Sequence, residues 1–121
     1  MKNLHFIGIG GIGMSSLAAA ALDMGFTVSG SDRGAERTEN RHIIQPLKNQ
    51  GITIFPQDGS RFAVHPLPDT IIYSTAIEAD NPDFAASGSI KRMHRSELLG
   101  KLLEYSGKES IAVTGSCGKS T

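Results

Sequence analysis

The chain has 121 residues, 39% of them hydrophobic, which is enough for one domain with a single core. Twelve Lys and Arg residues balance twelve Asp and Glu residues, and this excludes the strong basic field of proteins that bind nucleic acid or anionic membranes. One cysteine excludes an internal disulfide, and no signal peptide or stretch of roughly 20 apolar residues is present, so we expect a soluble, cytoplasmic protein.

Short apolar runs alternate along the chain with segments of helical periodicity. In chain order we expect a strand at residues 4–9, a helix at 12–24, a strand at 26–30, a helix at 41–49, strands at 52–55 and 70–73, a helix at 82–86, a strand at 89–93, a helix at 96–105 and a strand at 110–114. Gly25 and Gly51 are placed to end the first two helices. Pro82 suits the first turn of the third, with Asp80 or Asn81 as its cap.

Strands that alternate with helices, and that are apolar along most of their length, predict a particular architecture. The fold class is α/β, with a Rossmann-like parallel sheet of about five strands and helices on both faces. In the helix at 96–105 we expect four leucines on the inner side, namely Leu98, Leu99, Leu102 and Leu103. A boundary near Gly107 and Lys108 would divide the chain into this domain, residues 1–107, and the beginning of a second domain, residues 108–121.

A first glycine motif lies between the first expected strand and helix. Gly8, Gly10 and Gly13 form G-x-G-x-x-G, in which glycine permits a tight turn and a close approach of backbone to phosphate. The N-terminus of the helix adds unpaired N–H groups and partial positive charge, which favour a diphosphate. Asp32, at the end of the second strand, is placed to contact ribose hydroxyls. This motif does not distinguish UDP from NAD or FAD, and a purely structural glycine turn is the alternative.

A second glycine motif, T-G-S-C-G-K-S-T, occupies residues 114–121 after the last expected strand. It is similar to a phosphate-binding P-loop, in which Lys119 would reach the terminal phosphates of ATP and the Ser120 hydroxyl would bind magnesium. The motif is shorter than the general pattern, because Val113 occupies the place of the first glycine. We interpret Cys117 as a packing residue of the loop, because no histidine lies near it in the sequence.

The four histidines, His5, His42, His65 and His94, are scattered along the chain. They show no paired spacing on one helix face, so the sequence predicts no metal site built from them. His94 adjoins Arg95, but we expect a surface or packing role for it rather than acid–base chemistry.

Five motifs, in this order, carry a resemblance to a known family. They are G-I-G-G-I-G-M at residues 8–14, S-G-S-D at 29–32, S-T-A-I-E-A-D-N-P at 74–82, H-R-S-E-L-L at 94–99 and T-G-S-C-G-K-S-T at 114–121. Together they closely resemble the Mur ligases of bacterial peptidoglycan synthesis, and the resemblance spans the whole chain. One departure is S-C-G-K-S in the last motif, where Mur ligases usually have T-H-G-K-T or a similar sequence.

The resemblance implies a three-domain enzyme with an N-terminal domain for UDP, a central ATPase domain and a C-terminal domain for the amino acid. UDP-sugar binding would fall to Gly8, Gly10, Gly11, Ile12, Gly13, Asp32, Ser74, Thr75, Ala76 and Arg95. ATP binding would fall to Gly115, Ser116, Cys117, Gly118, Lys119, Ser120 and Thr121, with Lys119 and Ser120 catalytic and Ser120 the magnesium ligand in the full-length enzyme.

The chemistry implied by the resemblance is ATP-driven and magnesium-dependent joining of an amine to the carboxylate of UDP-N-acetylmuramic acid. The acceptor would be L-alanine or, in members that recycle cell-wall peptides, a tripeptide, and it would bind the C-terminal domain, which this chain does not contain. This fragment alone should therefore be inactive, with neither ATP nor magnesium bound. A second hypothesis, from another class, is a regulatory NAD-binding module, which rests on G-x-G-x-x-G and Asp32 alone and leaves Gly118, Lys119 and Ser120 unexplained. The sequence leaves the oligomeric state open.

Overall fold

The part of the chain that the structure describes contains one parallel sheet of five strands. The computed structural model describes residues 2–11 and 13–113, with side chains through Tyr105. The strands are β1 (Asn3–Ile7), β2 (Thr27–Ser31), β3 (Thr53–Phe55), β4 (Thr70–Tyr73) and β5 (Lys91–His94). Their order across the sheet is β3-β2-β1-β4-β5, and every neighbouring pair is parallel. The predicted Rossmann-like α/β fold is confirmed.

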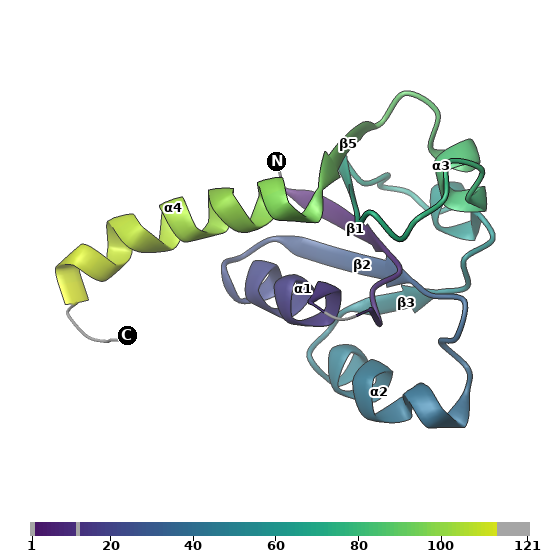
Figure 1. The fold of residues 1–121 in the computed structure, drawn as a ribbon, viewed down its shortest axis with the longest axis horizontal. Coiled ribbons are helices and arrows are strands. Elements are labelled where there is room, and N and C mark those ends of the chain that lie inside the picture. The colour runs from purple at the N-terminus through teal and green to yellow at the C-terminus, as the bar shows by residue number, and fades with distance from the viewer. Residues whose placement is uncertain (1, 12, 114–121) are drawn as a thin grey trace.

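Helices cover both faces of this sheet, also as predicted (Figure 1). They are α1 (Met14–Asp23), α2 (Arg41–Asn49), α3 (Pro82–Ser87) and α4 (Arg95–Val113), with short 3-10 helices η1 (Thr38–Asn40) and η2 (Ser60–Ala63). We call the side covered by α1, α2 and α4 the first face, and the side covered by α3 and η2 the second face. No helix among the described residues is both long and apolar enough to cross a membrane.

The first face holds the main apolar core. Because side chains alternate along a strand, Leu4 and Phe6 of β1 point toward this face, while His5 and Ile7 point toward the other. The core residues are Leu4, Phe6, Ile9, Met14, Leu17, Ala18, Ala21, Val28, Ile44, Leu47, Ile52, Ile72, Met93, Leu98 and Leu102. Alanines on the inner side of α1 let that helix lie close to the sheet, directly after the first glycine motif.

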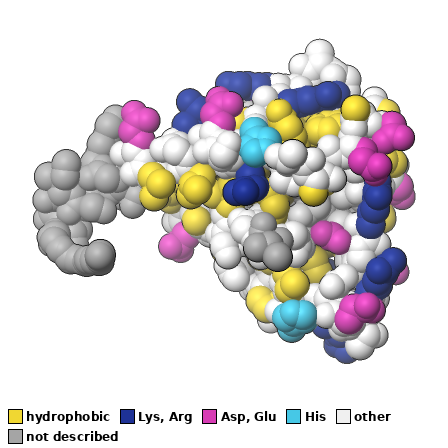
Figure 2. All heavy atoms as spheres, in the orientation of Figure 1, with side chains coloured by type: hydrophobic (Ala, Val, Ile, Leu, Met, Phe, Trp, Pro, Cys, Tyr) yellow, Lys and Arg dark blue, Asp and Glu magenta, His cyan; other side chains and the backbone are white. Residues whose placement is uncertain are grey.

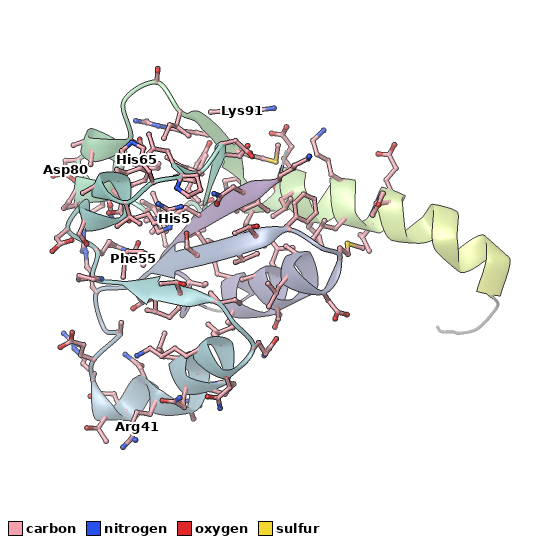
Figure 3. The ribbon with its side chains drawn as sticks, turned by 180° about the vertical axis from the view of Figure 1, so that it is seen from behind. His5, Arg41, Phe55, His65, Asp80 and Lys91 are labelled. Atoms are coloured by element: carbon pink, nitrogen blue, oxygen red, sulfur yellow. The ribbon has the colours of Figure 1, made fainter. Side chains whose placement is uncertain are left out.

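The second face has a smaller apolar cluster. Ile7, Ile71 and Phe84 are buried there, with Phe62, Tyr73, Ile77 and Ile90 packed around them. Beside this cluster the sheet carries buried polar side chains, which form a network described below. Figure 3 shows the molecule from this side, with His5 of β1 and Phe55 of β3 labelled.

Element bounds agree closely with expectation where the local signals are strong. Helix α2 and strand β4 have the expected bounds, and the other elements through β5 start or end within about two residues of expectation. The Asn81 side chain accepts a hydrogen bond from the Asp83 backbone N–H, so Asn81 rather than Asp80 caps α3. Gly25 and Gly51 follow their helices with positive φ.

The expected strand at residues 110–114 is wrong. Helix α4 continues from Arg95 to Val113, so residues 110–113 are helical, and the last residue of the expected strand lies outside the described residues. A strand needs a neighbouring strand for its hydrogen bonds, whereas a helix satisfies its own backbone. Because α4 leads away from the sheet, residues 110–113 have no strand beside them (Figure 1). The helix passes through Gly107 and Lys108 without a break, so the division at 107/108 stays a prediction.

The expected inner side of α4 is also only half right. Leu98 and Leu102 are buried, but Leu99 is 43% and Leu103 is 63% exposed. Successive residues of a helix are rotated by about 100° around its axis. A helix that meets the sheet along a narrow strip therefore buries two residues four positions apart, here Leu98 and Leu102, and leaves the residues that follow them exposed. Figure 2 shows hydrophobic side chains gathered where α4 leaves the body of the molecule, and acidic and basic side chains interspersed elsewhere on that face.

Candidate functional site

The predicted UDP-sugar-binding residues meet at one edge of the sheet. All five strands are parallel, so the segments that follow them start from the same edge, which we call the carboxyl edge. Phe6 lies opposite Ile72 in neighbouring strands, and Tyr73 lies opposite His94. The glycine motif after β1, Ser74–Ala76 after β4 and Arg95 after β5 are consequently neighbours, although they are up to 87 positions apart in the sequence (95 − 8).

The glycine loop after β1 is held in place by backbone hydrogen bonds. Gly8 and Ile9 donate to the Ser31 carbonyl at 2.8 and 3.0 Å, and Gly11 donates to the Gly8 carbonyl at 2.9 Å. Gly8 has φ +76° and Gly13 has φ +82°, a conformation that strains residues with a side chain. Gly13 immediately precedes α1, which has neither a side-chain cap nor an acidic residue in its first turn. The loop therefore directs the positive end of a helix toward the carboxyl edge. Ile12 lies outside the described residues.

Asp32 joins the two loops at the ends of β1 and β2. Its Oδ2 accepts the Gly10 backbone N–H at 2.8 Å and its Oδ1 accepts the Gly34 N–H at 2.9 Å. A Cβ on Gly10 would lie 2.9 Å from Asp32 Oδ2, so a side chain at position 10 would displace this carboxylate. The structure thus gives Asp32 a role in shaping the loop, and its expected contact with ribose stays a prediction.

Arg95 and residues 74–76 border the glycine loop from the other side. Arg95 begins α4, and its Nη1 lies 4.0 Å from the position that a Cβ on Gly13 would take. Ser74 accepts a hydrogen bond from the Ile77 N–H at 3.1 Å, which forms a tight turn with Thr75 and Ala76 exposed at its tip. Ile77 packs on the loop, since its Cδ1 would be 3.0 Å from a Cβ on Gly8. The structure brings these predicted residues together.

Two adjoining hollows lie at the carboxyl edge and form what we call the trough. The smaller, about 190 Å³, is bounded by Gly8, Asp32 and Ala76 among others. The larger, about 560 Å³, lies beyond the ends of β2 and β3, and both are lined by Asp32, Arg33 and Gln57. Their sizes suit a ligand as large as a nucleotide. The lining carries charges of both signs, so specificity would depend on individual contacts rather than on a uniform field.

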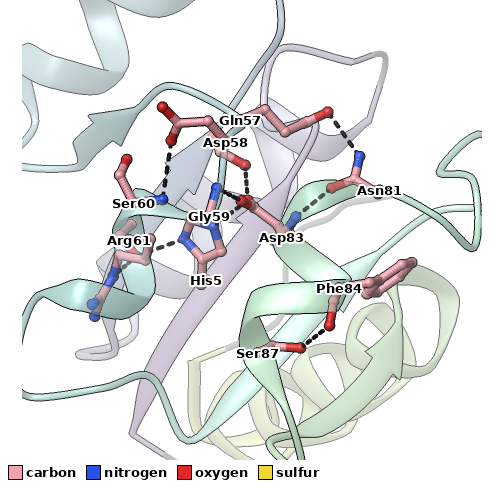
Figure 4. A network of polar contacts seen from close by, with 12 residues as sticks. His5, Gln57, Asp58, Gly59, Ser60, Arg61, Asn81, Asp83, Phe84 and Ser87 are labelled. Carbon is pink, nitrogen blue, oxygen red and sulfur yellow. Dashed lines mark hydrogen bonds and ion pairs between the residues drawn. The ribbon is translucent and has the colours of Figure 1, made fainter.

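Directly beneath this edge, on the second face, lies a buried chain of polar side chains (Figure 4). Asp83 of α3 accepts three hydrogen bonds: from His5 Nε2 at 3.0 Å, from the Ser31 hydroxyl at 2.5 Å and from the Gly59 backbone N–H at 2.9 Å. His5 Nδ1 pairs with the Ser29 hydroxyl at 3.0 Å, and Arg61 Nε donates to the same hydroxyl at 2.9 Å. We call these five side chains, His5, Ser29, Ser31, Arg61 and Asp83, the His5–Asp83 network.

The proton positions in the network follow from its donors. Arg61 can only donate to Ser29, so the Ser29 hydroxyl donates to His5 Nδ1, and His5 Nε2 carries the proton that Asp83 accepts. Burial lowers the pKa of His5 more than Asp83 raises it, so the ring is neutral. Burial alone would raise the pKa of Asp83, but hydrogen bonds from His5 and Ser31 lower it overall, so Asp83 is ionised. Each polar side chain of the His5–Asp83 network therefore has a hydrogen-bond partner.

Sequence reasoning did not identify this network. Ser31 belongs to it and also supplies the carbonyl that holds Gly8 and Ile9, so the network supports the glycine loop from below. Gln57 and Asn81, which line the trough, hydrogen bond to each other at 2.8 Å. The sequence held one signal of this network. His5 is a polar residue within an apolar strand, and β2 carries two serines at alternate positions, Ser29 and Ser31, the first of them opposite His5.

The second glycine motif cannot be placed. Gly115, Ser116, Cys117, Gly118, Lys119, Ser120 and Thr121 all lie outside the described residues, so their predicted ATP and magnesium roles stay predictions. Among the residues that the structure describes, no group of three or more His, Cys, Asp or Glu is arranged to hold a metal ion.

Comparisons with known proteins agree with this architecture. The model of the family described as "Mur ligase family, catalytic domain" matches residues 3–106. The chain is 43% identical to the bifunctional enzyme MurC/Ddl of Chlamydia trachomatis, covering 100% of this chain and 14% of that protein. It is 41% identical to UDP-N-acetylmuramate–L-alanine ligase of Syntrophus aciditrophicus, covering 100% of this chain and 24% of that protein.

Solved structures show the same fold. The ligase for UDP-N-acetylmuramate and L-alanyl-gamma-D-glutamyl-meso-diaminopimelate from Neisseria meningitides superposes with a TM-score of 0.71 at 25% identity. That match covers 84% of this chain and 31% of the other. The murein peptide ligase of Psychrobacter arcticus superposes with a TM-score of 0.66 at 26% identity, over 84% of this chain and 20% of the other.

The fold and the carboxyl-edge site define a Rossmann-like α/β protein with a glycine loop. Its family follows from the match over most of the chain: the protein belongs to the Mur ligase family. The chain spans a quarter or less of the length of the curated relatives it matches.

Proposed function

We propose that this chain binds the UDP part of UDP-N-acetylmuramic acid within an ATP-dependent ligase that joins L-alanine to that sugar. The observation that supports this most directly is the meeting of the glycine loop, Asp32, Thr75 and Arg95 at one edge of the sheet. Relatives about 40% identical over the whole chain carry the name of that ligase.

In this proposal the diphosphate lies at the N-terminus of α1. Backbone N–H groups and the partial positive charge of the helix attract it, and Arg95 adds a fixed fork of donors within reach of Gly13. The nucleoside then extends along the trough toward Asp32. The sugar carboxylate, at the other end of the ligand, is left free for reaction.

Peptide-bond formation from a carboxylate needs activation, because a carboxylate is inert to amines. In the reaction that family membership implies, the sugar carboxylate would take a phosphoryl group from ATP with release of ADP, and the amine would then displace phosphate from the resulting acyl phosphate. Magnesium would screen the phosphate charge. Lys119 and Ser120 are the residues of this chain proposed to hold ATP and magnesium. The described residues bind and orient the sugar nucleotide, and the remainder of the ligase would supply the acceptor.

A second candidate acceptor is a peptide. Two of the solved structures with the same fold are named as ligases of a peptide rather than of alanine. The same UDP-sugar site would serve either reaction, because the name of the alanine ligase and that of the Neisseria peptide ligase both include UDP-N-acetylmuramate. An assay of the complete protein with UDP-N-acetylmuramic acid, ATP and either L-alanine or the tripeptide separates the two.

The first experiment is calorimetric titration of the chain with UDP-N-acetylmuramic acid and, separately, with NAD. Binding of the UDP-sugar alone supports the proposal, and binding of NAD alone overturns it in favour of a regulatory NAD-binding module. Arg95→Ala should weaken UDP-sugar binding by about tenfold, the value of one charge-assisted hydrogen bond.

Arg92→Ala is the matched control for charge. Arg92 is also in this region of the chain, but its guanidinium lies 4.3 Å from the centre of the Phe84 ring and donates to the Phe84 carbonyl on the second face. Arg92→Ala therefore removes one positive charge at a position that does not border the glycine loop, and binding should stay within about twofold of the wild type. Equal losses in both variants would show that Arg95 acts only through net charge.

A further inference from the structure

Three polar side chains meet at the carboxyl ends of β4 and β5. His94, the last residue of β5, has its Nε2 3.0 Å from the Thr75 hydroxyl oxygen. Its Nδ1 accepts the Ser96 backbone N–H at 3.2 Å and lies 2.8 Å from the Ser96 hydroxyl oxygen. The imidazole thus joins the start of α4 to the turn that follows β4.

The hydrogen bonds define which ring nitrogen carries the proton. The Ser96 backbone N–H can only donate, so His94 Nδ1 accepts and carries no proton. In the neutral ring the proton is then on Nε2, and Nε2 donates to Thr75 Oγ1. Because Thr75 accepts from His94, the hydrogen of its own hydroxyl remains available to another acceptor.

The ring is held from a third side. Tyr73 lies opposite His94 in the β4–β5 pair, and the two rings meet edge to face with centroids 5.3 Å apart and planes at 89°. Such contacts, together with hydrogen bonds at both nitrogens, restrict rotation of the imidazole. The Thr75 hydroxyl therefore has an orientation imposed by a side chain that is itself fixed.

Thr75 is exposed at the tip of the turn that packs on the glycine loop through Ile77. Arg95, next to His94 in the chain, borders the same loop at Gly13. A hydroxyl donor at this position faces the same edge as the backbone N–H groups proposed to bind phosphate. An anion placed there would receive a hydrogen bond from the hydrogen that His94 leaves free.

We propose that His94 is a positioning residue that makes the Thr75 hydroxyl a donor to the diphosphate of the bound sugar nucleotide. This inference rests on the proposed function. Its simpler alternative is that His94 only caps α4, because its Nδ1 satisfies an N–H group in the first turn of that helix. The two roles use different ring nitrogens, so they can be separated by substitution.

The decisive variant is His94→Asn. An asparagine oxygen can still accept the Ser96 N–H and cap α4, but the shorter side chain cannot reach Thr75. The variant loses the Thr75 hydrogen bond and the Tyr73 ring contact, so we expect Tm to fall by only a few degrees. We expect the affinity for UDP-N-acetylmuramic acid, measured by calorimetry on the chain, to fall by about fivefold. His42→Asn, the same change at an exposed histidine of α2, should leave both unchanged.

Thr75 variants test the other partner. Thr75→Val removes the hydroxyl at nearly constant shape and should weaken binding by about tenfold, whereas Thr75→Ser should bind nearly as the wild type does. The double variant should bind no worse than Thr75→Val alone, because His94 would act only through that hydroxyl. The same factors are expected with UDP alone, which retains the diphosphate.

The proposal is overturned if His94→Asn binds as tightly as the wild type, or if the two losses multiply in the double variant. It is also overturned if ¹⁵N spectra of the wild-type imidazole show the proton on Nδ1, a measurement that does not depend on variant folding. If wild-type chain binds neither UDP-sugar nor UDP, the proposed function fails as well, and that result is distinct from tight binding by every variant.

Discussion

The two faces of the sheet are built in different ways. On the first face, apolar side chains from α1, α2 and α4 pack on β1, β2, β4 and β5 in one continuous core. On the second face, a small apolar cluster adjoins the His5–Asp83 network, whose polar atoms are all paired. Apolar burial is non-directional, whereas hydrogen bonds require particular positions.

The two faces therefore contribute differently to the stability of the fold and to the placement of the glycine loop. The first face contributes most of the apolar burial and tolerates small shifts of side chains. The network connects β1, β2, the loop before η2 and α3 through single defined contacts, and it includes Ser31, whose carbonyl holds the glycine loop. We therefore expect changes on the first face to cost mainly stability, and changes in the network to cost both stability and ligand affinity.

The largest expected effect is on the first face. Phe6 is fully buried at the centre of the core, and Phe6→Ala should lower the free energy of unfolding by about 4 kcal/mol, from lost burial and the cavity that remains. Urea unfolding followed by circular dichroism measures this change. A loss below about 1 kcal/mol would mean that the first face is not the main source of stability.

A second loss of stability from a single substitution is expected in the His5–Asp83 network. Asp83→Asn keeps the shape but places an amide where His5 and Ser31 both donate, and it should cost about 2 kcal/mol of stability. It should also weaken UDP-N-acetylmuramic acid binding, because Ser31 supports the glycine loop. Asp80→Asn, the same change at an exposed residue before α3, is the control and should alter neither. Normal ligand affinity in a folded Asp83→Asn variant would contradict the assigned placement role.

The pH dependence tests the same network in the wild-type chain. Burial lowers the pKa of His5 in the folded state, so the unfolded chain binds a proton more readily below about pH 6.5. Stability from this group is complete above that pH and declines as the pH falls below it. His5→Gln should flatten this part of the urea-unfolding profile.

A second decline is expected in stronger acid. Hydrogen bonds from His5 and Ser31 outweigh burial and lower the pKa of Asp83, so its contribution is present above about pH 4 and is lost as the pH falls further. Asp83→Asn should remove this component while leaving the other carboxylates to titrate. An unchanged acid limb in that variant would show that Asp83 is not ionised in the folded chain.

Neighbouring leucines of α4 give a comparison within one helix. Leu98 is fully buried and Leu99 is 43% exposed, so Leu98→Ala should cost about 3 kcal/mol and Leu99→Ala less than about 1 kcal/mol. Thermal unfolding of the two variants compares them directly. Equal losses would mean that the exposed strip of α4 is covered in solution.

Local patterns in the sequence determined most of the fold. Apolar runs, helical spacing and the caps at Asn81 and Gly25 are short-range features, and they predicted the strands and helices through β5 with small errors at their ends. The glycine motif and Asp32 likewise identified the loop that begins α1, because glycine is needed there by backbone geometry. The end of α4, residues 110–113, was predicted to be a strand. Helix and strand propensities are similar there, and no partner strand decides between them.

Only the tertiary structure decided which side chains meet across the sheet. Parallel pairing brings His94 to Thr75 and Arg95 to Gly13, and it joins His5 of β1 to Asp83 of α3 over 78 positions of sequence. Nothing local marks such partners, because each contact depends on strand order and register rather than on neighbouring residues. The sequence by itself determined where the loops and helices lie. The packing of the sheet decided which ring nitrogen of His5 and of His94 carries the proton, and which side chain that nitrogen contacts.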